Sequence, residues 1–281
     1  MQNHNENKDF SEKTVLHLNN STPNLWISQG EYAIIRVENQ RIRFIGSDMA
    51  TTCHIIILKT PKEVLCAHLS DIDEINECAE IFQQITQSQV SVYILGGFHD
   101  GNDNSKVTKL SKSLSDQLRT YFSLCCSIYK VELFFTCDTN TVNQKPMYMG
   151  MAYDLENSSI HPAIFQDDFP DLCLRTIGRW KHEGLVNIFD TSRDQIIIEP
   201  FASGIRYAFN INDFSDEQIL LLMSTSPTCE PPSFVPQMRA LWNFIEEHDN
   251  NFKIFFPNYL PRRYELTDSN EWQLCSDFCQ N

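Results

Sequence analysis

Residues 46–68, GSDMATTCHIIILKTPKEVLCAH, contain the residue types of a thiol nucleophile and its base. Cys53 follows a short polar stretch and opens an apolar run, so we expect it at the rim of a β-sheet. Backbone N–H groups at such a rim are available to form an oxyanion hole. A cysteine attacks as the thiolate and needs a neighbour that takes its proton. His68 is the candidate for that base.

The spacing of Cys53 and His68 places them on one face of a predicted β-hairpin. If the turn centres between Thr60 and Pro61, the two residues lie directly opposite each other. If Pro61 is the second residue of a four-residue turn, the pair becomes diagonal but keeps the same face. Only an odd shift of register would separate them.

Two neighbouring residues are rivals for these roles. His54 follows Cys53 directly and therefore points to the opposite face of the strand, which makes it a poor base. Cys66 falls on the shared face and is an alternative nucleophile, but it lies mid-strand among apolar residues. A cysteine and a histidine on one hairpin are more often packing residues, so the spacing alone does not establish catalysis.

The elements that must position these residues are mostly strands. We expect the hairpin strands over residues 53–58 and 64–68, followed by a helix over 71–87, a strand over 90–95 and a helix over 106–121. Further strands are predicted over 32–37, 42–45, 128–135, 147–154, 160–165, 186–189, 195–198, 263–266 and 272–275, and further helices over 168–179, 216–223 and 232–247. Helices do not alternate one-for-one with strands, so the pattern indicates an α+β fold with mainly antiparallel sheets flanked by helices.

Composition limits the partners. The net charge of −15 makes nucleic acid and anionic membranes poor ligands, because both need clustered cations. No apolar run approaches the roughly 18 residues of a membrane span. We expect residues 1–25 to be a flexible polar tail without a secretory signal, and residues 26–281 to form a single domain. The ten cysteines show no CxxC pair, which favours free thiols in the cytoplasm or the nucleus.

Common ligand motifs are absent. Residues 96–101, GGFHDG, lack the Lys-Ser/Thr of a phosphate loop, and residues 100–105, DGNDNS, lack the glycine and glutamate of a calcium loop. There is no GxSxG motif and no histidine pair with metal spacing. The sequence therefore predicts no metal and no cofactor.

Three blocks resemble the protein N-terminal asparagine amidohydrolase family, and the resemblance spans roughly residues 30–270. They are residues 45–58, IGSDMATTCHIIIL; residues 95–100, LGGFHD; and residues 224–235, STSPTCEPPSFV. The resemblance implies a cysteine amidohydrolase of the N-degron pathway, which deamidates N-terminal asparagine to aspartate, with Cys53 as nucleophile. It also implies kinship with bacterial glutamine deamidases, whose cysteine is followed by a histidine at a spacing like that of Cys53 and His68, and an α/β/β/α layered sandwich.

The same resemblance implies a third catalytic residue, a hydroxyl that orients the histidine. Ser47 is the matching candidate, and Thr51 and Thr52 stay open. The expected partners are proteins or peptides with a free N-terminal asparagine, bound by a monomer. The alternatives are a non-catalytic module that binds N-termini, and a glutamine deamidase acting on folded proteins.

A buried carboxylate is expected to recognise the substrate's α-ammonium group. Glu230 is the first candidate, because Pro231 and Pro232 stiffen the backbone that follows it. It could instead cap the next helix. Asp48 and Asp100, both in loops of the matched blocks, are the other candidates.

Overall fold

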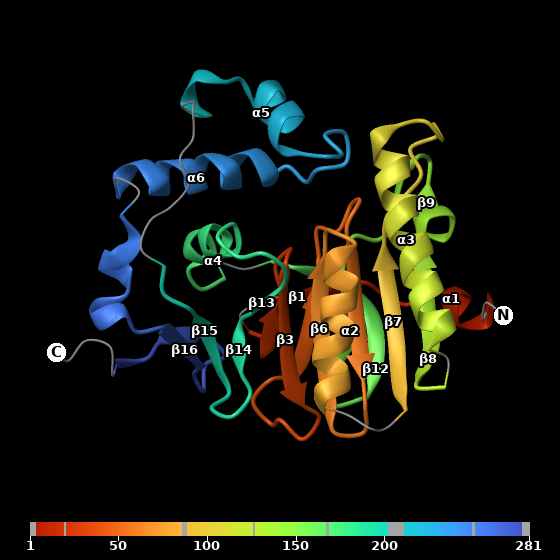
Figure 1. Ribbon diagram of the computed structural model, residues 1–281, viewed down its shortest axis with the longest axis horizontal. Helices are drawn as coiled ribbons and strands as arrows, with labels where there is room; N and C mark the ends of the chain where they lie inside the picture. Colours follow the sequence, from red (N-terminus) through yellow and green to blue (C-terminus); the bar gives the residue numbers. More distant parts are fainter. Residues whose placement is uncertain are drawn as a thin grey trace.

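Two β-sheets form the centre of the structure, a computed structural model that describes residues 4–19, 21–85, 89–125, 127–166, 169–201, 211–248 and 251–276 (Figure 1). The six-stranded sheet has the order β13 (Val186–Asn187), β3 (Glu31–Arg36), β6 (Glu63–Leu69), β5 (His54–Lys59), β7 (Val90–Gly96), β8 (Tyr129–Thr136). The five-stranded sheet has the order β1 (Leu16–Leu18), β12 (Ser159–Phe165), β11 (Met151–Asp154), β4 (Phe44–Ser47), β2 (Asn24–Trp26).

Smaller elements surround the two sheets. A four-stranded sheet has the order β14 (Phe189–Asp190), β15 (Gln195–Ile198), β16 (Arg262–Leu266), β17 (Trp272–Leu274), and β9 (Thr141–Val142) pairs with β10 (Lys145–Pro146). The helices are α1 (His4–Ser11), α2 (Asp73–Ile85), α3 (Lys106–Leu124), α4 (Leu172–Arg179), α5 (Asp216–Met223) and α6 (Phe234–Glu247). The predicted end of α2 at residue 87 lies outside the described residues. Among these residues, no helix combines the length and the hydrophobicity needed to cross a membrane.

Strand β5 explains how the layers stack, because it is buried on both faces. Ile56 and Leu58 pack against α2 and α3, which cover one face of the six-stranded sheet (Figure 1). Ile55 and Ile57 pack against the five-stranded sheet, where they meet residues such as Tyr153. A strand covered on both faces has a continuous apolar sequence, as in residues 55–58, IIIL. The α+β prediction is confirmed.

Residues 1–25 were expected to be a flexible tail, but the structure shows regular elements there. Residues 4–18 contain α1 and β1, and residues 24–25 are the start of β2. Phe10, Leu18 and Leu25 are almost completely buried, and β1 pairs in parallel with β12. The average composition of this segment is polar, but its few apolar side chains have sites in the core. Burying them stabilises an ordered segment despite the polar residues between them.

Candidate active site

The β5–β6 hairpin has the second of the two predicted registers. Ile55 is the partner of His68, so Cys53 is diagonal to His68 on the same face of the sheet. Thr60 makes this turn, because its hydroxyl oxygen accepts hydrogen bonds from the backbone N–H groups of Lys62 and Glu63. Pro61 is thus the second residue of a four-residue turn. The shared face lies between the two sheets, and Cys53 packs against that core.

Ser47 orients the imidazole of His68. It is the last residue of β4 in the neighbouring sheet, and its Oγ lies 2.8 Å from His68 Nδ1. The same Oγ donates its single proton to the carbonyl oxygen of Ile27 at 2.5 Å. Nδ1 must therefore carry the ring proton and donate it to Ser47, which leaves Nε2 with a free lone pair. This is the tautomer that a general base at Nε2 requires.

The thiol and the imidazole are not yet in contact. Nε2 of His68 is buried and has no hydrogen-bond partner among the described residues, so it does not bind Cys53 Sγ. A diagonal pair is farther apart than a directly opposed pair, which explains the gap. Catalytic hydrogen bonds often tighten only when the substrate is bound.

Both catalytic candidates are held in their neutral forms. Although Cys53 is partly exposed as a residue, burial of its thiol, together with the carboxylate of Glu74, raises the pKa of Cys53 to about 12. Burial lowers the pKa of His68 to about 3, and the charge of Arg179 acts in the same direction. Near neutral pH the resting pair is a thiol beside a neutral imidazole, rather than an ion pair. To attack as a thiolate, Cys53 would therefore need a base that takes its proton.

Small residues allow the backbone to approach Cys53 closely. The N–H of Gly97 donates to the carbonyl oxygen of Cys53 at 3.1 Å. A Cβ atom on Gly96 would lie 2.2 Å from that same oxygen, which no side chain could tolerate. The second block of the resemblance, residues 95–100, therefore lies against the backbone of Cys53, the candidate nucleophile.

The third block also meets the first at this point. Ser226 Oγ donates to Thr51 Oγ1 at 2.7 Å, and the hydroxyls of Thr52 and Thr225 lie 2.9 Å apart. Thr51 and Thr52 therefore tie the loop before Cys53 to residues 224–230. These two threonines have partners other than His68, and it is Ser47 that contacts the imidazole.

Glu230 lies in this joined region. It is partly buried, accepts a hydrogen bond from the hydroxyl of Ser224, and lies 3.5 Å from Ser226 Oγ. Burial raises the pKa of Glu230 above its ordinary value, while the two serines oppose the rise. Its charge also acts on the thiol of Cys53, where it raises the pKa. A carboxylate at this place could face a substrate's ammonium group.

Asp48 has a structural role, because both of its oxygens accept hydrogen bonds from other strands. Its two oxygens accept hydrogen bonds from Trp26 Nε1 at 2.9 Å and from the backbone N–H of Phe165 at 2.8 Å. Burial raises the pKa of Asp48 to about 6 in spite of these bonds. Asp48 thus joins β2 to the end of β12, and both of its oxygens are already engaged.

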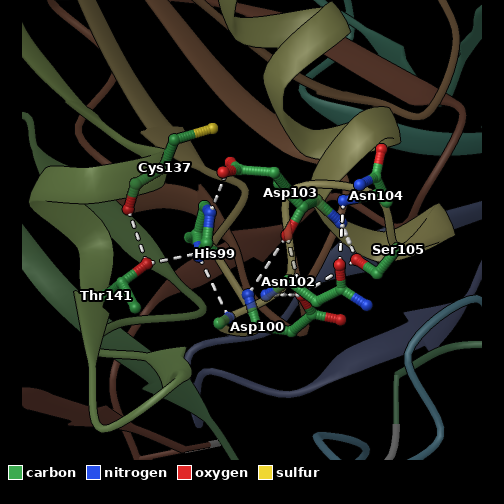
Figure 2. Close-up of polar contacts among 10 residues, drawn as sticks. His99, Asp100, Asn102, Asp103, Asn104, Ser105, Cys137 and Thr141 are labelled. Carbon is green, nitrogen blue, oxygen red and sulfur yellow. Dashed lines mark hydrogen bonds and ion pairs between the residues drawn. The ribbon is translucent and has the colours of Figure 1, made fainter.

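Asp100 accepts the hydrogen bonds that hold together the loop before α3 (Figure 2). Its Oδ1 accepts hydrogen bonds from the hydroxyls of Ser105 and Thr108, each at 2.8 Å, and from Asn102 N at 3.1 Å. Although burial acts against it, these bonds hold the pKa of Asp100 below its ordinary value. Its charge acts on Cys229, so the loop lies near residues 224–230. Asp100 organises this loop.

His99 holds the other side of the same loop. Its backbone N–H donates to Thr141 Oγ1 at 2.9 Å, and its Nε2 lies 3.0 Å from Asp103 Oδ1 (Figure 2).

Glu74 is a nearby carboxylate that the sequence interpretation did not single out. It is buried, and its Oε2 accepts hydrogen bonds from the backbone N–H groups of Ser70 and Asp71 at 2.5 and 3.1 Å. Burial raises the pKa of Glu74. Asp71 and Glu74 have the spacing of a capping box at the start of a helix, and this pattern could have identified Glu74 from the sequence.

Comparison with known proteins agrees with the three blocks. The family described as protein N-terminal asparagine amidohydrolase matches residues 14–274. Relatives with that name include the Homo sapiens protein, 28% identical over 271 residues that cover 90% of this chain and 84% of the relative. The Arabidopsis thaliana protein is 26% identical over 289 residues, covering 89% of this chain and 81% of the relative.

Proposed function

Because the chain belongs to the protein N-terminal asparagine amidohydrolase family, we propose that it is a cysteine amidohydrolase that deamidates the side chain of N-terminal asparagine. The observation that carries this proposal is the Ser47–His68 contact, which leaves a free lone pair on the face that Cys53 shares. A free asparagine terminus on a protein or peptide is the substrate, and the products are N-terminal aspartate and ammonia.

The first half of the reaction forms a thioester. His68 Nε2 takes the proton of the Cys53 thiol while the sulfur attacks the carboxamide carbon. A C–S bond forms, and the carbonyl π electrons move to oxygen, where backbone N–H groups near Cys53 stabilise the negative charge. The C–N bond then breaks, and His68 gives its proton to the leaving nitrogen, which departs as ammonia.

The second half consumes water. His68 removes a proton from a water molecule that attacks the thioester carbon, and the C–S bond breaks. The electron pair returns to sulfur, which takes the proton from His68 and restores the thiol. The product side chain is the carboxylic acid of aspartate, which ionises in solution. Atoms and charge balance without an external oxidant or reductant.

Selectivity has to distinguish both the terminus and the side chain. Glutamine is one methylene longer, and fit alone separates such substrates by about 1–3 kcal/mol. An internal or acetylated asparagine lacks the α-ammonium, so a carboxylate that binds this group would be left unpaired. Glu230 is the candidate for that carboxylate, because its charge reaches Cys53 and it is tied through Ser226 to the loop that carries the nucleophile.

The test of the activity is ammonia release from three matched peptides beginning with asparagine, glutamine and acetyl-asparagine. We expect turnover of the asparagine peptide alone, and none by Cys53→Ala at unchanged melting temperature. Turnover by Cys53→Ala would disprove the mechanism. Preference for glutamine within folded proteins would identify a glutamine deamidase, and binding without turnover would identify a non-catalytic module.

The role of Glu230 is tested with Glu230→Gln, using Glu247→Gln as a control for loss of a charge. Glu247 is exposed at the end of α6. We expect Glu230→Gln to weaken binding of asparagine peptides by about 2–5 kcal/mol, the usual cost of truncating a buried charge pair. An unchanged KM with a lower melting temperature would instead assign Glu230 a structural role.

The activity implies a place in the cell. Deamidation of N-terminal asparagine supplies the N-terminal aspartate of an N-degron, so we propose that the protein acts in ubiquitin-dependent degradation. A cytoplasmic and nuclear location and a monomeric state fit the free thiols and the acidic surface charge.

A further inference from the structure

Helix α4 directs two arginines toward the start of β3. Arg175 and Arg179 are four residues apart and therefore share one face of the helix. Arg175 is buried and pairs with Glu31, with Nε–Oε1 and Nη2–Oε2 distances of 3.1 and 2.5 Å. It also donates to the carbonyl oxygen of Trp26 at 3.1 Å. These contacts fix α4 against the sheet.

Arg179 lies one turn farther along, over Gly30. A Cβ atom on Gly30 would lie 2.5 Å from Arg179 Cδ and 3.2 Å from Nη1, and Gly30 has a φ of +74°. The backbone conformation therefore favours glycine at this position, and any side chain here would displace that of Arg179. The N–H of Gly30 donates to the carbonyl oxygen of His68 at 2.8 Å. One residue thus connects the arginine side chain to the backbone of the candidate base.

The charges around Cys53 are of both signs. Glu74 from α2 and Glu230 from the third block are negative, while Arg179 is positive, and His68 and His54 are neutral near pH 7. Arg179 lowers the pKa of Cys53 against the effects of burial and of the two carboxylates. It also lowers the pKa of His68, so that the base stays unprotonated. The positive charge therefore stabilises the thiolate of Cys53 and disfavours the protonated form of His68.

We propose that Arg179 is a positioning residue of the active site: its guanidinium, seated over Gly30, whose N–H bonds the backbone of His68, stabilises the negative charge that develops on Cys53 during attack. This inference rests on the proposed function for its catalytic consequence, but its effect on the thiol is independent of any substrate. A nearby positive charge stabilises the thiolate of a buried cysteine that is flanked by two carboxylates.

The experiment compares Arg179→Met with Arg179→Lys. Methionine keeps an apolar stem over Gly30 and removes the charge, while lysine keeps both. Arg193→Met, at an exposed position, controls for the change in net charge. The readouts are the rate of iodoacetamide alkylation of Cys53 between pH 7 and pH 10, kcat and KM for an asparagine peptide, and the melting temperature.

We expect Arg179→Met to slow alkylation about tenfold at each pH, which corresponds to a rise of about one unit in the thiol pKa. Its kcat should fall by a smaller factor at unchanged KM, because loss of the charge also raises the pKa of His68 and strengthens the base. Arg179→Lys should keep most of both rates, and Arg193→Met should match the wild type.

Wild-type alkylation in Arg179→Met would overturn the proposal. An equal loss of alkylation rate in the methionine and lysine variants, with a lower melting temperature in both, would also overturn the proposal. It would show that Arg179 has a packing role. Slower alkylation in a protein that releases no ammonia would support the electrostatic role while removing the proposed function.

Discussion

His54 and His68 are two buried histidines on one hairpin, and they face opposite sides of the same sheet. His54 Nε2 lies 2.7 Å from Ser115 Oγ on α3, whereas His68 Nδ1 lies 2.8 Å from Ser47 Oγ on the other sheet. Burial lowers the pKa of each to about 3. Burial and a perturbed pKa therefore do not distinguish the candidate base, His68, from His54.

The difference lies in the face of the sheet. Each ring has one nitrogen without a hydrogen-bond partner among the described residues, Nε2 in His68 and Nδ1 in His54. Only His68 shares its face with Cys53, while His54 faces α3 and binds Ser115 through Nε2. The alternation of side chains along a strand decides which histidine can reach the thiol. The proposed chemistry at this hairpin thus depends on strand parity and on Ser47 of the neighbouring sheet.

The largest expected effect comes from replacing each histidine with glutamine. Glutamine cannot act as a base, so His68→Gln should lower kcat for an asparagine peptide by about 10²–10⁴-fold, the usual contribution of a general base. His54→Gln should keep kcat within a few-fold while changing stability. Steady-state ammonia release from both variants tests this, and an equal loss of kcat in the two would contradict the distinction.

The pH dependence of unfolding sharpens the comparison next. A histidine whose folded pKa lies below its unfolded value stabilises the fold above pH 6.5, and this stability is lost as the pH falls toward the folded pKa of about 3. Between pH 7 and pH 4 the wild type should lose about 3 kcal/mol through His54, at 1.36 kcal/mol per unit. His54→Gln should lack this loss.

Urea unfolding of wild type and His54→Gln at pH 7 and pH 4 measures the effect. Asp48 contributes in the opposite direction, because burial raises its pKa to about 6, but it is present in both proteins and cancels in the comparison. A wild-type-minus-variant difference that stays constant with pH would show that His54 titrates normally.

The sequence could predict the shared face of Cys53 and His68 because both possible turns keep the same parity. It could not choose the register, since Pro61 fits either turn and the choice depends on hydrogen bonds from Lys62 and Glu63 to Thr60. The apolar run at residues 55–58 predicted a strand, and the structure shows that this strand is buried on both faces. The strands of the hairpin were therefore predictable from the pattern of apolar residues.

Long-range contacts were beyond the sequence. The partners of Asp48 are Trp26 and Phe165, the latter 117 residues away, and nothing local to Asp48 indicates them. Ser47 was predicted by resemblance, but its bond to the carbonyl of Ile27, which fixes the histidine tautomer, needed the structure. The burial of Phe10 was likewise not predicted, because the average composition of residues 1–25 is polar.

The smallest of these effects is expected for Ser47→Ala. Without the hydroxyl, the His68 ring loses the contact that fixes its tautomer, and we expect kcat to fall about tenfold, near the cost of one hydrogen bond. Ser159→Ala is the matched control, because Ser159 Oγ lies 2.9 Å from His161 Nε2 on β12. A loss of kcat in the control as large as that in Ser47→Ala would remove the special role of Ser47.

The central claim is that Cys53 becomes acylated during turnover, and acid quenching followed by peptide mass mapping tests it most directly. Wild type mixed with excess asparagine peptide should show the substrate's acyl group on Cys53, at a level that falls in His68→Gln. Acylation of Cys66 or Cys229 in place of Cys53, or turnover without any acylated cysteine, would contradict the account.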